Sequence, residues 1–183
     1  MATQYIFPLK SIWTTHQKES EVEQEKIIRN FLLSHSDMLR LDNEPWTVFP
    51  VLNWKKFSLI RRLGNQEDQE FLKTLSNLKE AFIEKWADTE KYHVEQPTNH
   101  LTEHYLFNLT VKLKKLLNES TLFWMTYQEP FYGFENPSFY RKQELLGHVI
   151  SHERIILLNL FSEEVIELKN QGIDFNIAES CEI

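Results

Sequence analysis

The sequence predicts a mainly α-helical fold, a single-domain bundle of four or five helices with a small irregular or β insertion near residues 45–63. Three observations lead to this prediction. Glycine occurs only four times among 183 residues, whereas sandwiches and barrels need glycine-bearing turns at short intervals. Several stretches space their apolar residues three and four positions apart, as one face of a helix requires. The length suits one domain with a developed core.

The chain is expected to begin with an arm, residues 1–18, that packs on the body and is interrupted by Pro8. A helix is predicted to follow, because Ser20 with Glu23 three positions later matches a capping box. Its buried stripe would consist of Ile27, Ile28, Phe31 and Leu32.

Residues 42–64 differ in character from the segments on either side. Pro45 and Pro50 exclude a continuous helix through the first half of this stretch. The segment "TVFPVL" suits an edge strand, and "NWKKFSLIRRL" fits a strand or a short helix equally well.

Two further helices are predicted before residue 120. In residues 66–92 the apolar side chains fall on one side of a helix, and Pro97 marks the break that follows. Residues 99–118 again show a helical stripe of leucines. A strand interpretation of this second stretch also exists, because Leu109, Val111 and Leu113 alternate with polar residues. The helix fits the longer window and is preferred.

The last third of the chain combines an aromatic connector with the longest predicted helix. Residues 120–140 hold eight aromatic residues together with two prolines. Residues 141–170 are predicted to form the helix, which would stop at Gly172, a typical residue just past a helix end. Residues 173–183 form a partly apolar C-terminal tail, so the whole of 1–183 is expected to be one globular domain.

Charge and cysteine content exclude several classes of function. The formal net charge is −7, so the broad basic surface that binds nucleic acid is absent and a nucleic-acid partner is not expected. Cys181 is the only cysteine, which excludes an internal disulfide and a cysteine-rich zinc site. The sequence shows no secretion signal and no apolar run long enough for a membrane span. A cytoplasmic protein without a membrane association is therefore expected.

Two histidines in the predicted last helix form a candidate metal site. His148 and His152 would lie roughly 40° apart on one side of that helix, with Glu144 one turn earlier. Imidazoles in this arrangement, with a carboxylate nearby, can bind zinc or iron. A further ligand could come from Glu153, or from His100 or His104 of another helix. The simpler interpretation is that the imidazoles serve packing and solubility, in which case no cofactor is expected.

Two family resemblances suggest enzymatic alternatives. The segment "HVISHE" is similar to the final helix of DinB-like metal-binding bundles, although Ile156 stands where that family places another histidine. This resemblance implies a metal-dependent helical-bundle enzyme. Arg141 and His148, with six residues between them, resemble the short motif of HEPN ribonucleases, which implies an RNA-cleaving bundle.

The aromatic connector carries the preferred functional hypothesis. Aromatic residues supply large contact areas in protein interfaces, and acidic residues beside them would suit a basic partner. We therefore expect a non-enzymatic cytosolic protein-binding module, of an inhibitor or immunity type, with no catalytic residues. A homo-oligomer is left open, and the alternative role of these rings is to fill the core. The expected contact residues are Trp124, Tyr127, Glu129, Phe131, Tyr132, Phe134 and Glu135.

Overall fold

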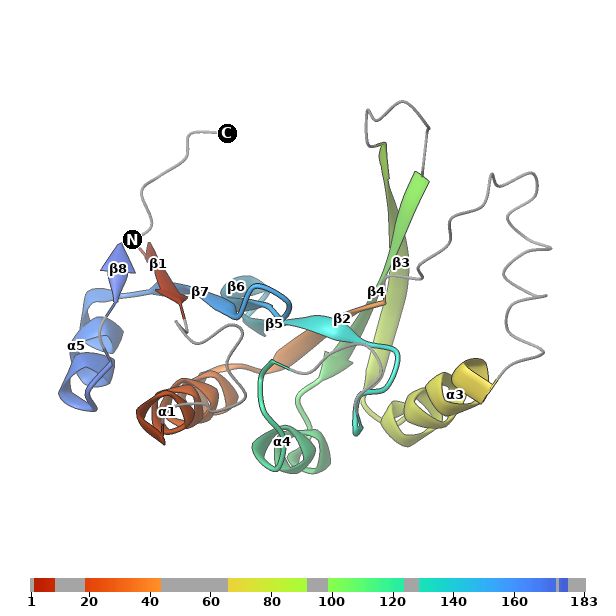
Figure 1. Ribbon diagram of the computed structural model, residues 1–183, viewed down its shortest axis with the longest axis horizontal. Coiled ribbons are helices and arrows are strands. Elements are labelled where there is room, and N and C mark those ends of the chain that lie inside the picture. Colours follow the sequence, from red (N-terminus) through yellow and green to blue (C-terminus); the bar gives the residue numbers. More distant parts are fainter. Residues whose placement is uncertain are drawn as a thin grey trace.

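The computed structural model describes residues 2–8, 19–43, 66–91, 99–123, 129–173 and 175–177. In this part of the chain, eight strands form one antiparallel sheet and four helices lie on one side of it (Figure 1). The predicted all-helical bundle is therefore wrong. The predicted insertion at residues 45–63 lies outside the described residues.

The elements alternate along the chain, and the strand order in the sheet is β3-β4-β2-β5-β6-β7-β1-β8. Chain neighbours β3 and β4 form one hairpin, and β5, β6 and β7 form a meander. The elements are β1 (Thr3–Pro8), α1 (Glu19–His35), β2 (Met38–Asn43), α3 (Gln66–Leu78), β3 (Phe82–Lys91), β4 (Asn99–Asn108), α4 (Val111–Asn118), β5 (Glu135–Arg141), β6 (Glu144–Ile150), β7 (Ile155–Leu160), α5 (Ser162–Asn170) and β8 (Asn176–Ile177).

The predicted long helix at 141–170 is replaced by the β6–β7 hairpin and the short helix α5. The apolar residues of this segment fit the spacing of a helix in part but also that of a strand. Ile156, Leu158 and Leu160 alternate along β7 and are buried on one face. The turn between β5 and β6 contains no glycine, so the usual signal of a hairpin is missing from the sequence. Gly172 does follow the last helix with a φ of +88°, as predicted.

The other helix predictions are partly right. The helix that was predicted after Ser20 is confirmed as α1, and it buries Ile28 and Leu32 completely. The helix predicted over 66–92 ends at Leu78 and gives way to β3. The helix predicted over 99–118 is confirmed only for α4, and the first part is the strand β4. The strand alternative is wrong for the residues on which it rested, because Leu109 follows β4 and Val111 and Leu113 belong to α4. The predicted N-terminal arm contains β1, a strand of the sheet.

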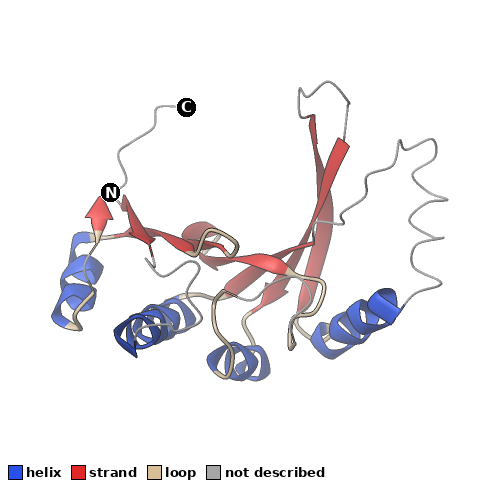
Figure 2. Cartoon of the chain, viewed as in Figure 1, coloured by secondary structure: helices blue, strands red, loops and turns tan. Residues whose placement is uncertain are grey.

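The core lies between the four helices and one face of the sheet (Figure 2). Gly147 of β6 faces this core, because a Cβ atom at that position would lie 2.6 Å from Leu32 Cδ2 of α1. Phe139, which pairs with Gly147, is fully buried on the same side. Since side chains alternate along a strand, Ser138 and His148 belong to the opposite face. No described helix covers that face, which is called the open face below.

A buried ion pair ties the segment after α4 to α1. The carboxylate of Glu25 lies 3.3 Å from the Arg29 guanidinium and accepts a 2.8 Å hydrogen bond from the backbone N–H of Leu122. Burial raises the pKa of Glu25, while the Arg29 charge and the Leu122 hydrogen bond act in the opposite direction. Removing either charge would leave the other buried without its partner.

None of the helices in the described part of the chain is long and apolar enough to cross a membrane.

We expect the β5–β6 turn to be a source of strain that substitution can relieve. Lys142 and Gln143 have φ values of +50° and +72°, which favour asparagine and glycine at the two central turn positions. The double change Lys142→Asn with Gln143→Gly should raise the free energy of unfolding by about 1 kcal/mol. Thermal unfolding should show the midpoint rising by roughly 2–4 °C.

A glycine placed in ordinary helical backbone provides the control for this experiment. Glu119 is the C-terminal cap of α4 and has a φ of −86°, so Glu119→Gly should give no stabilisation. An equal gain from both variants would show that the turn is not strained.

Candidate functional site

The expected contact residues of the aromatic connector do not form one exposed surface in the described part of the chain. Phe131 and Phe134 are fully buried, and the Phe134 ring contacts the rings of Phe71, Tyr105 and Phe107. These two rings fill the core and cannot contact a partner directly. Glu135 is buried as well, Tyr132 is half-buried and Glu129 is exposed. Trp124 and Tyr127 lie outside the described residues.

The candidate metal ligands do not share a helix, because the helix is absent. Glu144 is exposed at the start of β6, and His148 is half-buried within that strand. His152 lies in the turn after β6, exposed and 3.8 Å from the equally exposed carboxylate of Glu153. The described residues contain no group of three or more histidine, cysteine, aspartate or glutamate residues that could hold a metal ion.

Arg141 and His148 interact with different residues. Arg141, at the end of β5, forms an ion pair with Glu164 of α5. His148 instead pairs across the sheet with Ser138. The two residues therefore have different partners, and the helical geometry that the ribonuclease resemblance implied is not present.

A row of polar side chains crosses the open face of the sheet. Two residues of the central strand β2, Arg40 and Asp42, hold the row together by an ion pair of 3.1 Å. On one side Asp42 pairs with His104 of β4, which in turn pairs with Trp86 of β3. We call Trp86, His104, Asp42, Arg40, Ser138 and His148 the polar row.

The half of the row that ends at Trp86 is firmly fixed. Nδ1 of His104 lies 2.7 Å from Oδ1 of Asp42, and both residues are buried. Buried polar groups are costly unless they are paired, so this contact determines where the imidazole lies. The Trp86 ring packs against that imidazole, with 5.2 Å between the ring centroids and 32° between their planes. A buried histidine–aspartate contact thus supports a tryptophan that is 38% exposed.

The other half of the row contains a serine and a histidine in contact. Ser138 Oγ and His148 Nδ1 are hydrogen-bonded at 2.8 Å, and Arg40 is the register partner of Ser138 on the other side. Burial lowers the pKa of His148, the charge of Arg40 lowers it further, and that of Asp42 raises it. At neutral pH the imidazole is therefore uncharged.

This serine–histidine pair does not have the geometry of a nucleophilic site. Ser138 has no exposed surface, so its hydroxyl cannot reach a substrate in this arrangement. A catalytic triad needs a carboxylate that orients the histidine next to the serine. Here Asp42 is hydrogen-bonded to His104 instead. The polar row fits a role in fixing side chains on the open face better than a role in acyl transfer.

Exposed apolar side chains gather on the edge strand β3. Phe82 is 43% exposed, Ile83 is 41% exposed and Trp86 is 38% exposed, all within five consecutive residues. The other large apolar residues that are exposed in the described part of the chain are Val22, Leu72, Val111, Phe161 and Ile166. Val22, Leu72 and Val111 lie on three different helices, and Phe161 and Ile166 lie at the start and within α5. Scattered exposed residues of this kind are ordinary. The β3 group is the exception.

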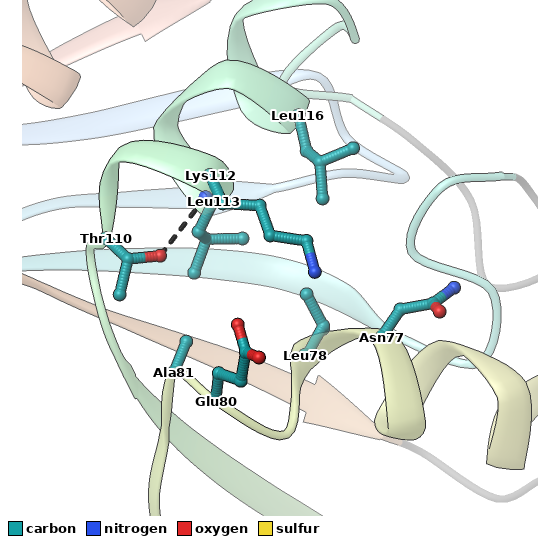
Figure 3. A pocket seen from close by; sticks show the side chains of 8 residues that line it. All are labelled: Asn77, Leu78, Glu80, Ala81, Thr110, Lys112, Leu113 and Leu116. Carbon is teal, nitrogen blue, oxygen red and sulfur yellow. Dashed lines mark hydrogen bonds between the residues drawn. The ribbon is translucent and has the colours of Figure 1, made fainter.

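A small hollow lies between the turn that follows α3 and the helix α4 (Figure 3). Its base is apolar, formed by Leu78 and Leu113 among others, and the side chains of Glu80 and Lys112 stand at its sides. It contains about 230 Å³ of empty space, part of which is open solvent. Sites for small molecules usually measure about 300–1,000 Å³, so this hollow is too small to serve as a cofactor site.

Comparison of the chain with protein-family models, with curated proteins and with solved structures finds no match. A function therefore has to be inferred from two features described above: the exposed apolar residues of β3 and the polar row that supports Trp86. The sequence analysis missed both features, because it assigned residues 66–92 to a helix. Charged residues of one sign at alternating positions, Glu84, Asp88 and Glu90, are the signal that could have revealed the strand.

We expect His148 to make the stability of the protein sensitive to mild acid. Below the usual histidine pKa of 6.5, the unfolded chain takes up a proton at this residue, whereas the folded protein with its lowered pKa does not. Stability should therefore fall as the pH drops below that value. Denaturant unfolding at about pH 7.5 and about pH 5.5 should show a smaller loss for His148→Gln than for the wild type.

His152→Gln is the matched control, because the His152 side chain is 58% exposed. It should retain the pH dependence of the wild-type protein. If both variants changed the pH dependence equally, burial of His148 would not be its cause.

Proposed function

We propose that this protein is a non-enzymatic protein-binding module and that the β3–β4 hairpin forms its contact region. The observation that carries this proposal is that one edge strand exposes Phe82, Ile83 and Trp86, with Phe82 on the helix-covered face beside Phe107 and Trp86 on the open face beside His104. Exposed apolar groups of this kind mark interaction sites in proteins. The hairpin also rises from the rest of the sheet, which leaves it accessible (Figure 1).

Trp86 has the properties of an interface anchor. Tryptophan is enriched among the residues that contribute most to binding energy, and an anchor held in place before binding loses less entropy when it binds. His104 and Asp42 supply that support from within the sheet. The proposed contact region therefore lies on β3 rather than on the aromatic connector.

A basic protein is the proposed partner, and inhibition of that partner is the proposed outcome. The chain has a net charge of −7, and the exposed Glu84 lies next to Ile83 on β3. Opposite charges speed association and select among partners. A cytosolic location belongs to the same proposal, supported by a sequence with only one cysteine.

The two enzymatic alternatives are not proposed. Both the DinB-like and the HEPN resemblance placed His148 on the last helix of a bundle, and His148 is instead a residue of the strand β6.

We expect Trp86→Ala and Ile83→Ser each to reduce capture of a partner protein from an extract of the native cells by fivefold or more (about 1 kcal/mol). Both side chains are exposed, so the variants should remain folded, as circular dichroism would show. Val111→Ser is the control, because Val111 is 87% exposed on α4, away from the hairpin. Equal capture by all of the variants would contradict the proposal.

A further inference from the structure

In the described part of the chain, no strand pairs with the outer edge of β3. β3 is ten residues long and stands at the end of the sheet, with β4 as its only described neighbour. An edge strand presents unpaired N–H and C=O groups, which form a template for another chain. The pairing with β4 is irregular between Phe82 and Glu84 and regular from Glu84 to Lys91. The regular part is long enough to pair with a segment of eight residues.

The charges of β3 are sorted by position. Carboxylate residues occupy alternate positions, Glu84, Asp88 and Glu90, and these are the positions that Trp86 shares. Trp86 belongs to the open face, because its ring packs on His104. The lysines of β3 stand at the intervening, odd-numbered positions. Lys85 is on the helix-covered face, where its Nζ lies 4.8 Å from the centroid of the Tyr105 ring.

This pattern opposes pairing between two copies of the strand. Residues opposite each other in an antiparallel pair point to the same face of the sheet, so only some registers are allowed. In the register centred on Trp86, Glu84 lies opposite Asp88 on both sides. In the register centred one residue later, Glu84 lies opposite Glu90 on both sides. Registers centred on Lys85 or Asp88 place that residue opposite its own copy. Like charges directly opposite each other are destabilising.

The same pattern favours a different occupant. A segment with lysine or arginine at every second position would place cations opposite the carboxylate positions of β3. The position opposite Trp86 would be basic as well, and a cation can stack on the face of the exposed indole ring. Main-chain hydrogen bonds would supply affinity, and the alternate side chains would supply specificity.

We propose that β3 binds an extended segment of a partner protein in which every second residue is basic, and that this segment adds a strand to the sheet. This inference rests on the proposed function, because it specifies how the hairpin contacts its partner. A second copy of the chain is excluded from the site by charge, whereas a basic strand is attracted to it.

Glu84→Lys tests whether the edge is free and whether charge protects it. The substitution converts both long registers to opposite-charge pairs, because the introduced lysine would face Asp88 in one register and Glu90 in the other. Sedimentation equilibrium should show a monomer for the wild type and a dimer for this variant. Hydrogen exchange of the β3 amides should slow in the dimer.

Two control variants separate this effect from a general change of charge. Glu167→Lys makes the same change at an exposed position of α5 and should leave the mass and the exchange unchanged. Glu84→Gln removes the carboxylate without creating a pair and should dimerise less than Glu84→Lys. An unchanged mass for Glu84→Lys would overturn the proposal. So would slow exchange, in the wild type, of the β3 amides that point away from β4.

Synthetic peptides test the proposed occupant directly. An acetylated octapeptide of alternating lysine and valine should bind the wild type at least tenfold more tightly than a block peptide of four lysines followed by four valines. Glu84→Lys should weaken binding of the alternating peptide at least tenfold, and Glu167→Lys should not. Equal binding of the two peptides would show attraction by charge alone and would overturn strand addition.

The peptide result and the capture result can be separated. Strand addition fails alone if partner capture depends on Trp86 while peptide binding does not depend on Glu84. The proposed function fails with it if neither substitution has any effect.

Discussion

The close packing of α1 against the centre of the sheet is the constraint on which the rest of the structure depends. Gly147 permits this approach, because a Cβ atom there would lie 2.6 Å from Leu32 Cδ2 and the leucine side chain would have to shift. This contact places one face of β5 and β6 against the core. Because paired residues share a face, the pairings extend the same two faces to β2, β4 and β3. The polar row and Trp86 lie on the open face for this reason.

The sequence analysis identified elements whose signals are local and failed where two periods overlap. The glycine after α5 is a local signal that was read correctly, and the helix expected after Ser20 exists, although it already begins at Glu19. Ile156 and Leu160 fit a helical stripe and a strand face equally well, whereas Leu158 fits only the strand, and tertiary pairing decides between the two. Scarce glycine was misleading, because Lys142 and Gln143 adopt the turn conformation that glycine usually supplies.

The residues of the candidate site come from three strands that are distant in the chain. Trp86, His104 and Asp42 are brought together by the pairing between β3, β4 and β2 rather than by one stretch of sequence. Asp42 and His104 lie 62 positions apart in the chain, and a short sequence motif cannot indicate a contact between residues so distant in the chain. Phe131 and Phe134 were expected at the surface because composition does not distinguish a ring that fills the core from one that binds a partner.

The place of β1 in the sheet affects how the chain can fold during synthesis. β1 lies between β7 and β8, and its residue Thr3 pairs with Leu160. During translation, β1 therefore cannot pair until almost the whole described chain has been synthesised. Contacts so distant in sequence slow folding, and unpaired strands left exposed meanwhile are prone to aggregate. Of the described strands, β1 is made first and is among the last to find its partners.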